Sequence, residues 1–375
     1  MATIFIQKDE VYRTRVEDIT DQRQFFYPVY EQARDSLLEL TAYTKKYWDE
    51  HTPPPATIEE LQKNWEKHSQ KSELLMPPIN PMRLRGYPNN IIAFCADRGH
   101  GKTSAMLSFS KALKDSKKTK DEEAAFWEGK LQDYRFYALD PIDPTVLENT
   151  DHIIPTIISR MFAKFTKKAE ELHNSSQNSY GGYRGQDTRR DLRDQQQKLL
   201  KLFQNCYRLA DEQKDNAKRS DNYDDLQLLA DRGDSSNFKV RFWELVWNYL
   251  LFMNLNEAGY PSADLQKTFL VIQIDDADMN PKHAYDVVED LRKYCVLPNV
   301  VILFATNLEQ LEMCVEQHFV NSFEPMIKLT VSNDADSLKS AADSRRHCHY
   351  TTASYLDKLI PSLHRINLPD INHTL

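Results

Sequence analysis

The chain has 375 residues, of which 41% are hydrophobic, so it can bury one large core or two modest ones. It has no run of 18 apolar residues, which excludes a membrane-spanning helix at the level of sequence. A net charge of −8 is untypical of proteins that bind nucleic acid regardless of sequence, although it leaves a local basic groove open. The five cysteines form no CxxC pair, which argues against a disulfide framework or a zinc ribbon and favours the cytoplasm.

Residues 1–84 are expected to form a helical N-terminal region. Apolar residues recur every three or four positions from Phe26 to Leu40, which is the spacing of one helix face. Prolines at 53–55 interrupt this pattern, and a helix-start signal follows at Thr57.

Residues 85–375 are expected to form one α/β core with a parallel sheet flanked by helices. Short apolar runs, typical of buried strands, alternate with helical patterns, and parallel sheets bind their ligands at the carboxyl ends of the strands. The predicted strands lie within 91–96, 134–147, 268–281, 299–307 and the final segment 355–371.

A helical insertion is expected at about 151–265. It should contain an amphipathic helix at 151–173 and a buried helix at 240–255. Between them, the polar stretch 174–197 is predicted to be a mobile segment, because it contains three glycines and shows no hydrophobic face. Residues 227–237 are predicted to form a further loop.

The segment ADRGHGKTS, at 96–104, follows the first predicted core strand and precedes a helix. This is the order of a phosphate-binding loop, in which glycines turn backbone N–H groups toward phosphate oxygens and the helix N-terminus adds a positive dipole end. The lysine would contact the β- and γ-phosphates of ATP, and the threonine would hold Mg²⁺. A chance glycine-rich turn is the alternative. The candidate nucleotide-binding residues are Arg98, Gly99, His100, Gly101, Lys102, Thr103 and Ser104.

One position departs from the usual GxxxxGK[ST] pattern. Ala96 stands where the first glycine belongs, and alanine fits there only if its φ is negative.

Two acidic residues end the apolar run at 270–274. Asp275 is a candidate for organising Mg²⁺ together with Thr103, and Asp276 for activating the attacking water. Asp-Glu is the commoner pair, so the shorter Asp276 must lie closer to the water or act more slowly. Alternatively, both acids only cap the following helix.

Polar residues also end the neighbouring apolar run. Asn307 is expected to contact the γ-phosphate and the attacking water, unless it only closes a turn. Arg345 and Arg346 are candidates for stabilising transition-state charge in a neighbouring subunit, with Arg365 as a rival and a solvated surface role as the alternative.

Four segments, in chain order, resemble landmarks of the KAP-type P-loop NTPases within the wider AAA+/STAND group. They are 96–104, 269–281, 299–307 and 355–369, and the resemblance covers about residues 85–371. It implies an AAA+-like P-loop fold that binds ATP and Mg²⁺ and hydrolyses ATP. Two departures are the absence of transmembrane helices from the insertion and Met279 in place of the arginine of the family's DDLDR motif.

Within that group, the chain is similar to the ring-forming ATPase subunits of the RADAR anti-phage systems, which act with an adenosine deaminase. This resemblance implies a homo-oligomeric ring, an effector partner and a cytoplasmic role in antiviral defence. A nucleotide-gated STAND switch with slow turnover and a nucleic-acid motor or loader stay open as alternatives. Because the sequence ends after the last expected core strand, we expect a C-terminal helical lid to be missing and the chain to be a piece of a longer protein.

Overall fold

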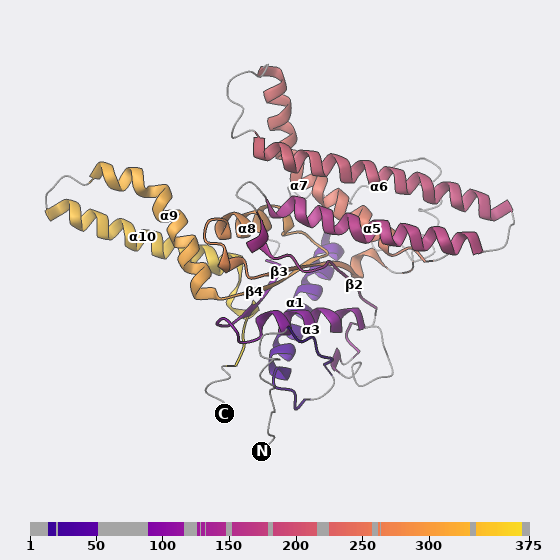
Figure 1. Ribbon diagram of the computed structural model, residues 1–375, viewed down its shortest axis with the longest axis horizontal. Helices are drawn as coiled ribbons and strands as arrows, with labels where there is room; N and C mark the ends of the chain where they lie inside the picture. Colours follow the sequence, from indigo (N-terminus) through magenta and orange to yellow (C-terminus); the bar gives the residue numbers. More distant parts are fainter. Residues whose placement is uncertain are drawn as a thin grey trace.

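A parallel β-sheet of five strands forms the centre of the computed structural model (Figure 1). The structure describes residues 14–19, 22–51, 89–115, 126–127, 129–131, 133–147, 152–178, 183–215, 225–256, 262, 264–330 and 335–369. The strands are β1 (Ile91–Cys95), β2 (Arg135–Ala138), β3 (Thr268–Asp275), β4 (Val300–Thr306) and β5 (Arg365–Asn367). Their order across the sheet is β2-β3-β4-β1-β5, and all neighbours run parallel. The predicted α/β class is therefore confirmed.

Alternate residues of β1, β3 and β4 enter two separate hydrophobic cores. On β3, Leu270 and Ile272 face one core while Phe269 and Val271 face the other, and all four side chains are buried. A strand that is buried on both faces needs an unbroken apolar run, which explains the sequence pattern of β1, β3 and β4.

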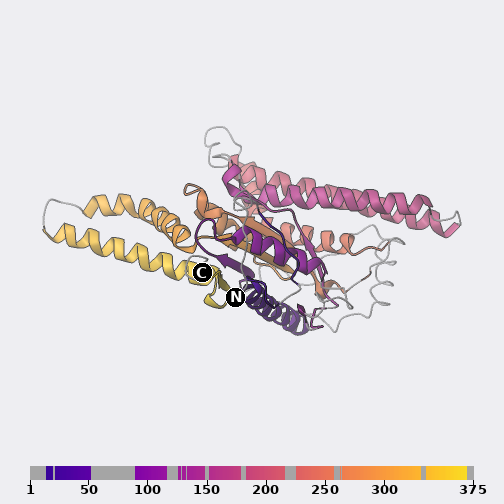
Figure 2. The same ribbon diagram turned by 60° about the horizontal axis from the view of Figure 1, so that its bottom comes forward.

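Helices cover both faces of the sheet (Figures 1 and 2). On one face lie α1 (Tyr27–His51) and α3 (Lys102–Asp115). The other face carries α5 (Ile153–Asn178), α7 (Asp225–Met253) and α8 (Ala284–Asp290), and α6 (Tyr183–Asp215) packs against α5 and α7. Short helical turns are η2 (Pro144–Val146), η3 (Leu265–Lys267), η4 (Ala277–Met279), the π-helix η5 (Leu291–Cys295) and η6 (Ser362–His364).

Two expectations within the insertion are wrong. Residues 174–178 and 183–197, expected to be part of a mobile segment, form the end of α5 and the first half of α6, and the expected loop at 227–237 lies within α7. Leu192 is the one buried apolar residue described within 183–197, and most of the apolar side of α6 follows this stretch, where Leu199, Phe203 and Cys206 are buried against the neighbouring helices. In α7, the buried turns from Phe238 onward outweigh the cost of one internal glycine, which is about 1 kcal/mol.

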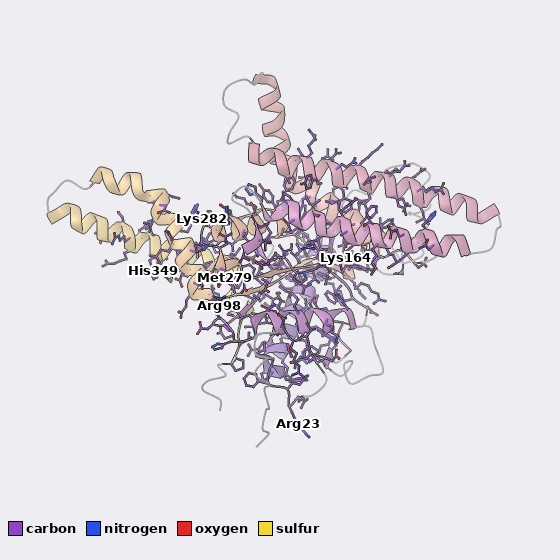
Figure 3. All side chains as sticks on the ribbon, in the orientation of Figure 1. Arg23, Arg98, Lys164, Met279, Lys282 and His349 are labelled. Carbon is purple, nitrogen blue, oxygen red and sulfur yellow. The ribbon has the colours of Figure 1, made fainter. Side chains whose placement is uncertain are left out.

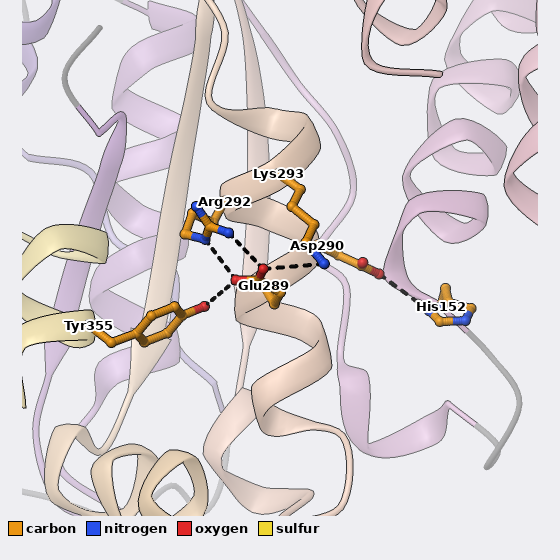
Figure 4. Close-up of polar contacts among 6 residues, drawn as sticks. All are labelled: His152, Glu289, Asp290, Arg292, Lys293 and Tyr355. Carbon is orange, nitrogen blue, oxygen red and sulfur yellow. Dashed lines mark hydrogen bonds and ion pairs between the residues drawn. The ribbon is translucent and has the colours of Figure 1, made fainter. Parts of the chain in front are cut away.

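The helices α9 (Leu308–Thr330) and α10 (Ala335–Leu359) form a hairpin that projects from the sheet (Figure 1). Polar contacts fix its base to α8 and η5 (Figure 4). Tyr355 donates a hydrogen bond to Glu289, which also accepts two from Arg292. Although burial opposes ionisation, these hydrogen bonds lower the pKa of Glu289 to about 2. The hairpin therefore leaves the core at a fixed place beside β4.

None of the helices in the described ranges combines the length and apolar composition needed to cross a membrane. The predicted boundary at residue 84 and the helix expected after Thr57 lie outside the described residues.

Asn299 holds together the loops at the amino ends of β3 and β4. Its φ of 64° is left-handed, a conformation that asparagine tolerates better than most residues. Its amide group donates to the carbonyls of Leu265, Gln266 and Thr268, and its oxygen accepts a hydrogen bond from the buried Trp48 indole.

We predict that Asn299→Ala lowers the free energy of unfolding by about 2–4 kcal/mol, because it leaves buried polar groups unpaired and strains the backbone. Urea denaturation measures the loss. Asn299→Gly loses the same hydrogen bonds as Asn299→Ala but adopts the left-handed backbone without strain, so it should recover a minor part of the loss. Full recovery by glycine would show that the hydrogen bonds contribute little.

Candidate nucleotide-binding site

Residues 96–101 link the carboxyl end of β1 to the first turn of α3. Gly99 and Gly101 have φ values of 84° and 85°, so the turn uses glycine where other residues would be strained. Ala96 is not among the described residues with positive φ, so alanine meets the condition set by the sequence. The loop therefore has the backbone freedom that a phosphate-binding turn needs.

The two glycines differ in what surrounds them. A β-carbon on Gly99 would meet no atom within 4 Å, whereas one on Gly101 would lie 2.9 Å from the ring of Phe26. Open space thus lies beside Gly99, and the segment that enters α1 packs against Gly101. Ser104, a predicted binding residue, accepts a hydrogen bond from the Arg15 backbone N–H through its hydroxyl.

The side chains of Thr103 and Asp275 meet across the sheet. Thr103 lies in the first turn of α3, and Asp275 is the last residue of β3, with β4 between β3 and β1. The Thr103 hydroxyl donates a hydrogen bond of 2.9 Å to Asp275 Oδ1. The fold therefore brings together the two groups that the sequence assigned to one Mg²⁺ ion.

Lys102 is almost completely buried at this edge, with 6% of its surface exposed. Its ammonium donates to the backbone carbonyl of Asp97 over 3.3 Å. The positive charge of Lys102 partly offsets the burial that raises the pKa values of Asp275 and Asp276, so the ammonium lies within electrostatic range of both carboxylates.

Burial and the neighbouring Asp276 raise the pKa of Asp275 to about 6, while the bond from Thr103 partly offsets the shift. The pKa of Asp276 is raised as well, chiefly by burial, and the charges of Lys102 and Arg98 oppose the shift. Burial and like charge both disfavour the ionised form of two neighbouring acids, and a nearby cation favours it. A cation bound beside Asp275 and Asp276 would therefore be attracted by both carboxylates.

Asp276 has a left-handed backbone, with φ of 52° and ψ of 36°. It precedes η4, yet its side chain makes no capping hydrogen bond to that turn. The alternative that these acids only cap a helix therefore fails for Asp276. Unusual backbone conformations that no local bond explains occur preferentially at functional sites.

Asn307 follows β4 and touches the loop after β1. Its amide nitrogen donates to Asp97 Oδ1 over 2.8 Å, and its oxygen accepts from the backbone N–H of Gln310. Asn307 thus caps α9 and also contacts the loop after β1, so it does more than close a turn at the end of β4.

Sequence reasoning missed three acidic residues at this edge. Asp143 follows β2, and its charge contributes to the raised pKa values of Asp275 and Asp276. Asp97 accepts the bond from Asn307, and the buried Asp278 accepts one from Thr306. Asp143 could have been noticed, because it is an acid just beyond the carboxyl end of a predicted strand.

The structure does not bring Arg345 and Arg346 to this edge. Both lie exposed on α10, about one turn before His349, which Figure 3 shows out on the hairpin, while Arg98 lies at the sheet. Arg346 is 3.7 Å from Asp343 of its own helix. The rival, Arg365, joins β5 to the end of α10 through Asp357 and the Ile360 carbonyl.

No protein-family model matches the chain, and no curated protein matches it. Among the described residues, no group of three or more His, Cys, Asp and Glu side chains is arranged to hold a metal ion alone. The donor set fits a cation that takes one or two protein ligands and completes its shell with water and phosphate, as Mg²⁺ does.

We predict that Asp275→Asn stabilises the nucleotide-free protein at pH 7 by about 1–3 kcal/mol. The folded carboxyl group, with its pKa raised to about 6, binds more protons than the unfolded one between about pH 4 and 6. Its contribution to stability therefore falls as pH rises through that window, and the asparagine removes this cost. Urea denaturation at several pH values measures the difference, which should vanish near pH 4. A variant that is less stable at pH 7 would contradict the assignment.

Proposed function

We propose that the chain binds a nucleoside triphosphate, ATP by default, with Mg²⁺ at the carboxyl edge of the sheet and hydrolyses it. The contact between Thr103 and Asp275 carries the proposal, because it joins a glycine-rich loop before a helix to an acid at the end of a buried strand. A P-loop NTPase fold of the AAA+ type is compatible with the parallel sheet and gives these residues their proposed roles.

Each side chain receives a role from its position. Backbone N–H groups at 99–103 and the N-terminus of α3 would bind phosphate oxygens, and Lys102 would neutralise the β- and γ-phosphates. Thr103 and Asp275 would hold Mg²⁺, which neutralises developing charge on the phosphates when it is bound.

Asp276 would accept a proton from the attacking water, and Asn307 would orient that water and the terminal phosphate. Burial raises the pKa of Asp276, which makes the carboxylate a stronger base than an exposed aspartate.

Through the family resemblance, the proposal extends to a homo-oligomeric ring of KAP-type ATPases that acts with an effector, an adenosine deaminase, in anti-phage defence. The exposed position of Arg345 and Arg346, on a hairpin that projects from the core, favours their action on a neighbouring subunit over action on their own.

We predict that the chain hydrolyses ATP in the presence of Mg²⁺, at a rate per chain that rises with protein concentration. Lys102→Ala should abolish nucleotide binding, whereas Asp276→Asn should retain binding and lower kcat about 100-fold or more. Phosphate release and equilibrium ATP binding measure the two effects. Tight binding without turnover in the wild type would favour the nucleotide-gated switch, and stimulation by DNA or RNA would favour the motor.

The role of the α10 arginines is tested by mixing two inactive variants. Asp276→Asn chains carry intact arginines, and chains with both Arg345→Ala and Arg346→Ala carry an intact site. If the arginines act between subunits, the mixture should regain hydrolysis that neither variant shows alone. Full activity of the double arginine variant by itself would exclude this role.

A further inference from the structure

Asp97 accepts hydrogen bonds from two side chains proposed to bind phosphate, Lys102 and Asn307. Its backbone carbonyl accepts a bond of 3.3 Å from the Lys102 ammonium. Its side-chain Oδ1 accepts a bond of 2.8 Å from the Asn307 amide. These are the two donors that the proposed function directs at the terminal phosphate, so this inference rests on that proposal.

A carboxylate at this position resembles a phosphate in its chemistry. It presents negatively charged oxygens, and such oxygens form stronger hydrogen bonds with N–H donors than neutral acceptors do. The Asp97 side chain is solvent-exposed, so its bond to Asn307 can exchange at low cost for a bond to a ligand oxygen.

We propose that Asp97 limits the preference for triphosphates over diphosphates, because its carboxylate occupies Asn307 in the nucleotide-free protein as a terminal phosphate would. To bind Asn307, the terminal phosphate of a triphosphate must break the hydrogen bond between Asn307 and Asp97. It must also lie near the negative charge of the Asp97 carboxylate. A diphosphate brings no terminal phosphate to this position, so the bond between Asp97 and Asn307 persists.

The contact between Asp97 and Asn307 also couples ligand binding to the hairpin of α9 and α10. Asn307 accepts a hydrogen bond from Gln310 N–H and so caps α9, the first helix of the hairpin. Transfer of Asn307 from Asp97 to a terminal phosphate therefore acts on the first turn of α9, while the base of the hairpin stays fixed through Glu289 and Tyr355.

Removal of the Asp97 carboxylate should strengthen triphosphate binding and barely change diphosphate binding. The competing bond is exposed and joins a neutral donor to a charged acceptor, so we expect a gain of about three- to tenfold. Asp97→Asn keeps a side-chain acceptor without the charge and should give a smaller gain than Asp97→Ala.

The test is calorimetric titration, in Mg²⁺, of ADP and the non-hydrolysable β,γ-imido analogue of ATP. The proteins are the wild type, Asp97→Ala, Asp97→Asn and Asp140→Ala. Asp140 is the matched charge control, because it is an exposed acid that pairs with Lys164 of α5 outside the loop. Thermal unfolding verifies that each variant is folded.

The expected result is a rise in the affinity ratio of analogue to ADP for Asp97→Ala, an intermediate rise for Asp97→Asn and no change for Asp140→Ala. Parallel changes in both affinities, an unchanged ratio, or an equal rise for Asp140→Ala would overturn the inference and leave the proposed function intact. If the wild type binds neither nucleotide, the proposed function fails and this inference fails with it.

Discussion

The hydrogen bond between Thr103 and Asp275 is the interaction on which the candidate site depends. It connects residues 172 positions apart, from the helix after β1 and the end of β3, so it forms only when both strands have taken their places around β4. The loop before α3 contributes turns at two glycines, and β4 contributes Asn307. The carboxyl ends of β1, β3 and β4 thus lie together at one edge of the sheet, which is where parallel α/β sheets bind ligands.

Charge is unevenly balanced at this edge. One buried ammonium, from Lys102, lies within electrostatic range of Asp275 and Asp276. The pKa values of both acids are raised because burial and the charges of neighbouring acids exceed the attraction of nearby cations. Raised pKa values of this kind cost folding stability in the nucleotide-free protein, which is common where function needs charges that the fold alone would not select. A divalent cation with a polyanionic ligand would relieve the repulsion between the acids and also satisfy the lysine.

The strands and the site loop could be predicted because their signals are local: apolar runs buried on both faces, glycines before Lys102, and acids after Ile274. Helix α6 was missed because most of its buried residues follow a stretch that is largely polar, with Leu192 as its one described buried residue, and tertiary packing decides such segments. Asp97 was missed for another reason, because its proximity to Asn307 depends on strand order, which the sequence did not reveal. Asp143, by contrast, carried a local signal, since it is an acid just beyond the carboxyl end of a predicted strand, and its charge contributes to the raised pKa of Asp275.

The most direct test of the account is calorimetric titration of ATP, with and without Mg²⁺, into the wild type and Thr103→Val. Valine keeps the shape of threonine but removes the hydroxyl that contacts Asp275. The account predicts that Mg²⁺ strengthens ATP binding to the wild type and loses most of this effect in the variant, which should stay folded. Absence of ATP binding by the wild type, or the same Mg²⁺ dependence in both proteins, would contradict it.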